Sequence, residues 1–170
     1  DTPGVTRDRI YAEAEWGEHK FILIDTGGIE PKSEDTILKQ MRTQAEIAVS
    51  TADVIVFMCD IRAGLLADDR DIAIMLKKSG KPIILAVNKA DSIGALPYEF
   101  YEFYELGFER EPIALSSLHG TGSGDLLDAI IEECDFSESD DEDNGMINVA
   151  VIGKPNAGKS SIINRMCGEE

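Results

Sequence analysis

The residues from Gly153 to Ser160 read Gly-Lys-Pro-Asn-Ala-Gly-Lys-Ser and form a complete phosphate-binding loop near the carboxyl end of this 170-residue chain. The apolar run at 147–152 predicts a buried strand before the loop, and residues 161–166 predict a helix after it. Such a loop usually joins the first strand of a nucleotide-binding domain to its first helix. Here the other parts of the domain precede the loop, so the fold must accept an unusual order of elements.

Each part of the loop has a chemical role. Gly153 and Gly158 let the backbone turn its N–H groups inward, so that these donors and the positive end of the following helix face a phosphate. Lys159 adds a positive charge, and the Ser160 hydroxyl is placed to bind a Mg²⁺ that bridges the outer phosphates. A chance match is the alternative, and the correct flanks argue against it. The residues expected to contact the nucleotide here are Gly153, Lys154, Pro155, Asn156, Ala157, Gly158, Lys159, Ser160 and Ser161.

The run Asn88-Lys89-Ala90-Asp91 points to the base. It follows the apolar run at 83–87, which places it at the carboxyl end of a parallel strand, where open α/β sheets bind ligands. The Asp91 carboxylate can accept hydrogen bonds from the ring N–H and the exocyclic amino group of guanine, whereas adenine offers no such pair. Asn88 can reach the other base edge or join this run to the phosphate loop, and the Lys89 stem can lie over the ring. A solvated turn after a strand is the alternative interpretation.

The run Asp25-Thr26-Gly27-Gly28 follows a strand-like segment at 21–24. We expect all four residues to lie at the nucleotide. A carboxylate at Asp25 can hold Mg²⁺ through water, while the Gly28 N–H can contact a γ-phosphate and so detect whether it is present. This run therefore predicts a switch.

Two further segments complete the expected site. Thr6 lies on a loop before the predicted strand at 10–16 and is a candidate second hydroxyl ligand for the metal. Ser116 and Ser117 end another apolar run and can offer backbone donors to the guanine oxygen.

Strands and helices alternate along the chain, which predicts a three-layer α/β domain. The hydrophobic share of 43% is enough to form a core. We expect strands near 10–16, 20–25, 53–59, 82–88, 112–115 and 146–152, and helices near 34–50, 67–79, 98–106 and 123–134.

The net charge of −17 argues against direct RNA binding by this segment, because phosphate backbones attract clustered Lys and Arg. No apolar stretch has the length of a membrane-spanning helix, so no membrane association is expected. Cys59, Cys134 and Cys167 lack metal-ligand spacing and a paired framework, which favours a reducing, cytoplasmic location.

Taken together, these motifs resemble the translation-factor-related GTPases and, among them, the Der (EngA) family of bacterial tandem GTPases. The resemblance implies a Ras-like P-loop GTPase fold, a guanine nucleotide (GTP or GDP) with Mg²⁺, and a role in assembly of the large ribosomal subunit. The runs that carry it are 1–9, 24–29, 60–64 and 119–122, together with the phosphate loop.

The resemblance also suggests which residues act in hydrolysis. Lys159, Thr6 and Gly28 would serve the transferring phosphoryl group. Ile29 stands where Ras-like proteins place a water-orienting glutamine, so hydrolysis is expected to be slow. Asn156 resembles the asparagine that helps coordinate K⁺ in related GTPases, which suggests stimulation by K⁺.

The same resemblance divides the chain into three parts. Residues 1–134 correspond to a first GTPase domain without its own phosphate loop, the acidic run 135–145 is a linker, and 146–170 open a second GTPase domain. The terminal part docks onto 1–134 of the same chain and gives a circularly permuted domain, docks onto a second copy and gives a dimer, or leaves an incomplete fragment that binds nucleotide weakly or not at all. An eleven-residue linker reaches roughly 18 Å, which permits docking. Each motif occurs once in the chain, and this observation does not decide between these possibilities for the terminal part.

Overall fold

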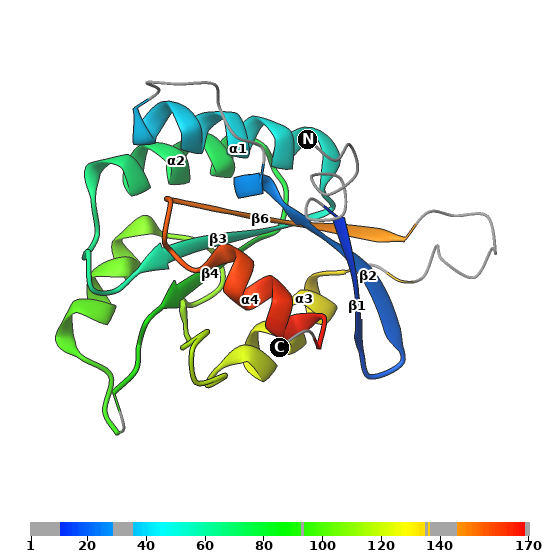
Figure 1. The fold of residues 1–170 in the computed structure, drawn as a ribbon. Helices are drawn as coiled ribbons and strands as arrows, with labels where there is room; N and C mark the ends of the chain where they lie inside the picture. The colour runs from blue at the N-terminus through cyan, green and yellow to red at the C-terminus, as the bar shows by residue number, and fades with distance from the viewer. Residues whose placement is uncertain (1–10, 29–35, 93, 135, 137–145, 169–170) are drawn as a thin grey trace, which may run out of the picture.

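The computed structural model describes residues 11–28, 36–92, 94–134, 136 and 146–168. These residues form one sheet with helices on both faces (Figure 1). The strands are β1 (Tyr11–Trp16), β2 (His19–Asp25), β3 (Val54–Asp60), β4 (Ile83–Asn88), β5 (Ile113–Ala114) and β6 (Ile147–Gly153). The α-helices are α1 (Ile37–Thr51), α2 (Ala67–Lys78), α3 (Ser123–Glu133) and α4 (Lys159–Met166), and the 3₁₀ helices are η1 (Thr26–Gly28) and η2 (Tyr98–Leu106).

The strand order is β1-β2-β6-β3-β4-β5, so the last strand in the sequence lies inside the sheet. β6 runs parallel to both neighbours: Val149 is opposite Leu23 of β2 and Val54 of β3. β1 and β2 form an antiparallel hairpin at one edge. The apolar run that predicts β6 suits this place, because an interior strand of a parallel sheet is covered on both faces.

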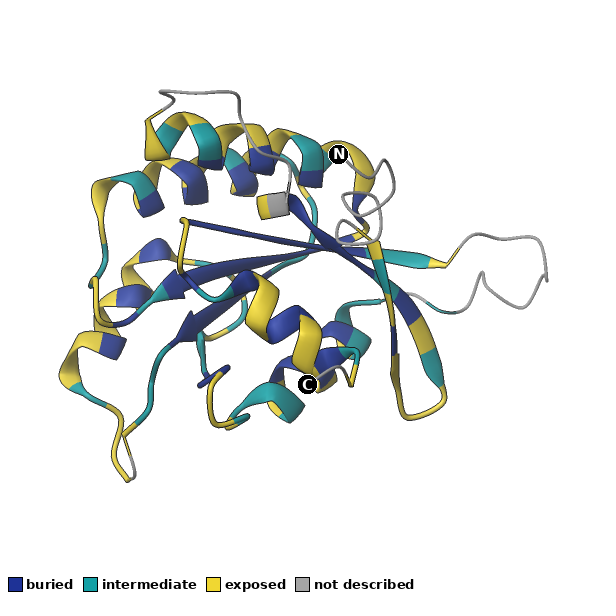
Figure 2. Cartoon of the chain, viewed as in Figure 1, coloured by how far each residue is buried: buried dark blue, intermediate teal, exposed yellow. Residues whose placement is uncertain are grey.

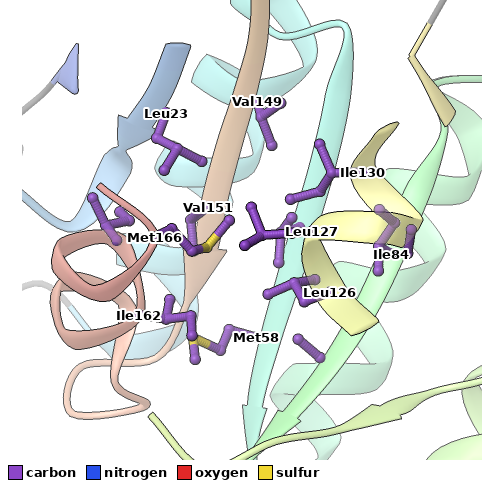
Figure 3. Packing of buried hydrophobic residues seen from close by; sticks show 14 of the residues in the cluster. Leu23, Met58, Ile84, Leu126, Leu127, Ile130, Val149, Val151, Ile162 and Met166 are labelled. Atoms are coloured by element: carbon purple, nitrogen blue, oxygen red, sulfur yellow. The ribbon is translucent and has the colours of Figure 1, made fainter. Parts of the chain in front are cut away.

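Helices α1 and α2 cover one face of the sheet, and α3 and α4 cover the other (Figure 1). One buried cluster joins α3 and α4 to the sheet, with Ile162 and Leu126 facing Val151 and Met58 (Figure 3). A second cluster on the opposite face joins α1, α2 and η2 to the sheet. Its residues include Met41, Ile72 and Phe103. The predicted three-layer α/β fold is confirmed.

The expected elements appear with small differences in their bounds. The helix at 98–106 is a 3₁₀ helix, and the strand expected at 112–115 is reduced to Ile113–Ala114. Cys59 is buried, and none of the three cysteines, all of which the structure describes, forms a disulfide. Among the helices that the structure describes, none has the length and apolar character needed to cross a membrane. Thr6, Ile29 and nearly all of the predicted linker lie outside the described residues.

Candidate nucleotide-binding site

The phosphate loop connects β6 to α4, and its lysine is folded back into it. The Lys159 ammonium donates to the backbone oxygens of Gly153, at 2.7 Å, and Lys154, at 2.8 Å. Burial lowers the pKa of Lys159, and the nearby Asp25 carboxylate opposes that shift. A Cβ on Gly27 would lie 2.6 Å from the Lys159 Cε, so a larger residue there would require the Lys159 side chain to shift.

Two of the three expected metal ligands meet across the site. The Ser160 hydroxyl, in the first turn of α4, donates to the Asp25 carboxylate at the end of β2, with 2.8 Å between the oxygens. The other Asp25 oxygen accepts from the Gly27 N–H at 3.0 Å. Oxygen donors of this kind suit Mg²⁺, which is usually held by one or two carboxylates together with phosphate oxygens and water. The described residues contain no group of three or more His, Cys, Asp or Glu placed to hold a metal.

A buried glutamine supports the entrance to the loop. The Gln44 Oε1 accepts from the Gly153 N–H at 3.1 Å, and it lies 3.2 Å from the Thr26 hydroxyl. That hydroxyl is closer to the Val151 backbone oxygen, at 2.6 Å, and it has a single proton to donate. Gln44 was not predicted. Its signal is a glutamine within the otherwise apolar, buried stripe of α1.

The Lys154 side chain points toward α2 and not toward the expected position of the nucleotide. Its ammonium is buried 4.0 Å from the carboxylate of Asp69 at the start of α2. That carboxylate accepts from the Leu66 N–H at 3.0 Å through Oδ2, while its Oδ1 has no hydrogen-bond partner among the described residues. Burial raises the pKa of Asp69. The expected nucleotide contact of Lys154 is therefore limited to its backbone in this conformation.

Asn88 takes the second of its two expected roles and joins two loops. Its Nδ2 donates to the Ala157 backbone oxygen at 2.7 Å, and its Oδ1 accepts from the N–H and the hydroxyl of Ser117, both at 2.9 Å. Gly158 has a left-handed φ of +100°, and a Cβ there would lie 2.2 Å from the Asn88 Nδ2. The phosphate loop is thus held against the end of β4.

The residues expected to read the base are held by neighbouring side chains. The Asp91 carboxylate accepts from the Ser116 hydroxyl and, at 2.5 Å, from the Arg62 guanidinium. The hydrogen bond from Ser116, assisted by the Arg62 charge, lowers the pKa of Asp91. The Lys89 ammonium donates to the Asp60 carboxylate at 2.6 Å. Asp60 and Arg62 were not predicted as site residues, although Asp60 ends β3 and Arg62 follows it, beside the strand that carries the motif.

Arg165 is a further residue that sequence reasoning missed. From α4 it donates to the backbone oxygens of Ser117, at 3.0 Å, and Leu118, at 3.1 Å.

Pro155, Asn156 and Ser161 are exposed at the mouth of the phosphate loop, and Asn156 has a left-handed φ of +63°. Gly28 ends η1. Every described element of the expected site therefore lies at the carboxyl end of the parallel strands.

The family comparison agrees with this geometry. The model of a family described as "50S ribosome-binding GTPase" matches residues 1–89 and 148–170, which include the phosphate loop and the asparagine of the base motif. The chain belongs to this GTPase family. Its relatives are Der proteins: GTPase Der of Acetivibrio thermocellus is 61% identical over the whole chain, and GTPase Der of Ruminiclostridium cellulolyticum is 57% identical over 99% of it.

The resemblance to Der is thereby confirmed. The chain spans 38% of the length of each of these two Der proteins. Among solved structures, a probable GTP-binding protein engB matches with a TM-score of 0.51 and 25% identity, covering 77% of this chain and 84% of the other. This match supports the P-loop GTPase fold for the sheet in which β6 is an interior strand.

Proposed function

We propose that this Der-family chain binds GTP and GDP with Mg²⁺ and hydrolyses GTP slowly, in a site that the terminal part completes. On this proposal 1–134 and 146–170 are the two parts of one permuted domain, joined by the linker 135–145. The observation that carries the proposal is the bridge made by Asn88, which holds the phosphate loop at Ala157 and the base-side loop at Ser117. The loop that would hold the phosphates and the loop that would contact the base are thereby fixed relative to each other.

Binding would exchange internal contacts for contacts to the nucleotide. Lys159 is held by two backbone oxygens and its pKa is lowered by burial, so an incoming phosphate would supply the negative charge that favours its protonated form. Asp91 already accepts from Ser116 and Arg62, and the guanine N–H groups would compete for the same oxygens. A base without these N–H groups would donate fewer hydrogen bonds to the Asp91 carboxylate, so the site should select guanine.

Hydrolysis would depend on positioning and on electrostatic stabilisation. When bound, Mg²⁺ would neutralise charge on the outer phosphates, with Ser160, Asp25 and Thr6 as the residues to hold it. Lys159 and the loop N–H groups would stabilise the charge on the transferring group, and the Gly28 N–H would contact the γ-phosphate. The Ile29 side chain cannot orient the attacking water, so GTP hydrolysis would be slow. A K⁺ ion held by Asn156 would assist it.

The alternative is a fragment that binds nucleotide weakly and does not turn it over. Calorimetric titration with GDP and with ADP, in Mg²⁺ and K⁺, separates the two. We expect GDP to bind and ADP not to bind, Lys159→Ala to abolish GDP binding, and Lys20→Ala, an exposed lysine on β2, to leave it unchanged. Absence of GDP binding by the unaltered chain would support the fragment alternative.

A variant at the base motif tests selectivity separately. Asp91→Asn reverses the donor and acceptor pattern presented to the base, so GDP affinity should fall while xanthosine diphosphate affinity rises. A variant that loses both nucleotides equally would argue against a role for Asp91 in reading the base.

We also propose a role in assembly of the large ribosomal subunit, in the cytoplasm. The matched family description and the Der relatives support this proposal. The net charge of −17 indicates that any ribosome contact would rely on specific patches or on other parts of a longer protein. Co-sedimentation with purified large subunits, in GDP and in a non-hydrolysable GTP analogue, tests it. Equal absence from the subunit fraction in both would contradict binding by this chain.

A further inference from the structure

The 3₁₀ helix η2 is built from a three-residue repeat. Its residues read Tyr-Glu-Phe, Tyr-Glu-Phe, Tyr-Glu-Leu over 98–106. A 3₁₀ helix has three residues per turn and rises about 2 Å per residue, so each position of the repeat forms a straight row with about 6 Å between members. The third row is apolar and buried against the sheet face covered by α1 and α2: Phe100, Phe103 and Leu106.

The other two rows face solvent, as the exposed stretches between β4 and β5 indicate (Figure 2). We call them together the tyrosine–glutamate face. It consists of Tyr98, Tyr101 and Tyr104 with Glu99, Glu102 and Glu105. The tyrosines are 81%, 53% and 43% exposed, which is unusual for three large aromatic residues in one row.

Two of the three exposed tyrosine rings pack against a buried ring of the apolar row. Tyr101 and Tyr104 both meet the Phe100 ring edge-on, with centroid distances of 5.8 and 6.1 Å. Their own rings lie 6.2 Å apart and within 20° of parallel. A surface whose aromatic rings are already fixed loses little side-chain entropy on binding, which favours recognition.

The chemistry of the face selects a cationic partner. Aromatic faces attract cations, and the neighbouring carboxylate row adds negative charge in a chain whose net charge is −17. Arginine suits both rows, because its planar guanidinium stacks on an aromatic ring and can also donate two hydrogen bonds to a carboxylate. Glu105 already accepts a hydrogen bond from the Arg70 guanidinium, at 2.9 Å. The carboxylate row repels phosphates, so a nucleic acid does not fit.

We propose that the tyrosine–glutamate face binds an extended segment of a protein partner that carries arginine at every second position. In an extended strand, alternate side chains on one side repeat at about 6.6 to 6.8 Å. This repeat is close to the 6.2 Å between the Tyr101 and Tyr104 rings. Successive arginines on one side of the segment would therefore lie against successive tyrosine rings of the tyrosine–glutamate face. Consecutive arginines in such a segment would point to opposite sides.

Two capped peptides of equal charge and composition test the spacing. The first is Ac-Arg-Thr-Arg-Thr-Arg-NH₂ and the second is Ac-Arg-Arg-Arg-Thr-Thr-NH₂. Each is titrated into ¹⁵N-labelled protein at physiological salt, and the amide shifts are followed by NMR. We expect the alternating peptide to bind about five-fold more tightly and to shift signals from residues 98–106.

Variants assign that preference to the face. Tyr101→Ala should abolish it, whereas Tyr101→Phe should keep it, because the ring is retained. Glu102→Gln should reduce it two- to three-fold without altering the aromatic row. The control Tyr11→Ala removes an exposed tyrosine from β1 and should leave the preference unchanged.

Several results would overturn the proposal. Equal affinity for the two peptides, or shifts spread over other acidic surfaces, would mean diffuse charge attraction alone. A single-stranded oligonucleotide that shifts the same signals would assign the face to nucleic acid. Self-association lost in Tyr101→Ala would assign it to a second copy of the chain.

Discussion

Replacement of one buried side chain in α4 tests whether the terminal segment is part of the fold. Ile162 is 0% exposed and packs in the cluster that contains Leu126, Met58 and Val151 (Figure 3). Ile162→Ala removes three carbons, worth about 0.8 kcal/mol each, and leaves a cavity, so the free energy of unfolding should fall by about 3 kcal/mol. With a urea m-value of about 2 kcal/mol/M, the midpoint should fall by about 1.5 M.

The single tryptophan gives a probe that is distant in sequence from the substitution. Trp16 lies in β1, and its Nε1 donates to the Asp128 carboxylate of α3 at 2.7 Å. Its fluorescence during urea unfolding therefore reports on the first 134 residues. The matched control is Asn164→Ala, an exposed position in the same helix, which should move the midpoint by about 0.25 M or less.

Ile72→Ala makes the result decisive. Ile72 is buried in α2, in the other cluster, and its replacement should lower the Trp16 midpoint by an amount similar to Ile162→Ala. If Ile72→Ala lowers the midpoint and Ile162→Ala does not, the terminal helix is not packed on the rest of the chain. That result would refute both the permuted domain and the site that depends on it.

Three further predictions concern the site. Ser160→Ala removes the hydroxyl proposed to bind Mg²⁺, so the expected gain in GDP affinity from Mg²⁺ should fall about ten-fold, as measured by titration with and without Mg²⁺; an unchanged gain would exclude Ser160 as a ligand. GTP hydrolysis should be faster in K⁺ than in Na⁺, and Asn156→Ala should remove the difference; equal rates in the two salts for the unaltered chain would contradict the K⁺ proposal. The pKa of Asp91 is lowered below its ordinary 3.8 in the fold, chiefly by the hydrogen bond from Ser116, so its stabilising effect is present above 3.8 and is lost as the pH falls through the folded value. The urea midpoint should consequently drop less between about pH 5 and about pH 3 in Asp91→Asn than in the unaltered chain; identical pH dependence would show that the carboxylate makes no net contribution.

The local elements could be predicted because their signals are local. Apolar runs of strand length predict β3, β4 and β6, and the glycine pattern of the phosphate loop predicts the start of α4. The 3₁₀ form of η2 was missed, although its signal is present: a period of three residues fits a 3₁₀ helix better than the 3.6-residue period of an α-helix. A period count over 98–106 would have found it.

The partners of the site residues could not be predicted in the same way. Asn88 had two possible roles, and the choice between them depends on where β6 lies in the sheet. Gln44 of α1 contacts Gly153 at the end of β6, 109 residues away in the sequence, and Arg165 of α4 contacts Ser117 in a loop, 48 residues away. No pattern within a single segment carries that information. Only the order of the strands in the sheet brings these side chains together at the carboxyl ends of the parallel strands.

The position of β6 connects stability to binding. Without β6, the described sheet would separate into the hairpin β1–β2 and the strands β3 to β5, and an isolated hairpin is at best marginally stable. The pairing that closes the sheet also carries the phosphate loop to Asn88 and Asp25, because the loop begins where β6 ends. A nucleotide that binds only this closed form should stabilise it by about 2.7 kcal/mol at a hundred-fold excess over Kd. Such a gain would oppose most of the loss expected for Ile162→Ala, so GDP should restore much of that variant's midpoint, whereas ADP should not.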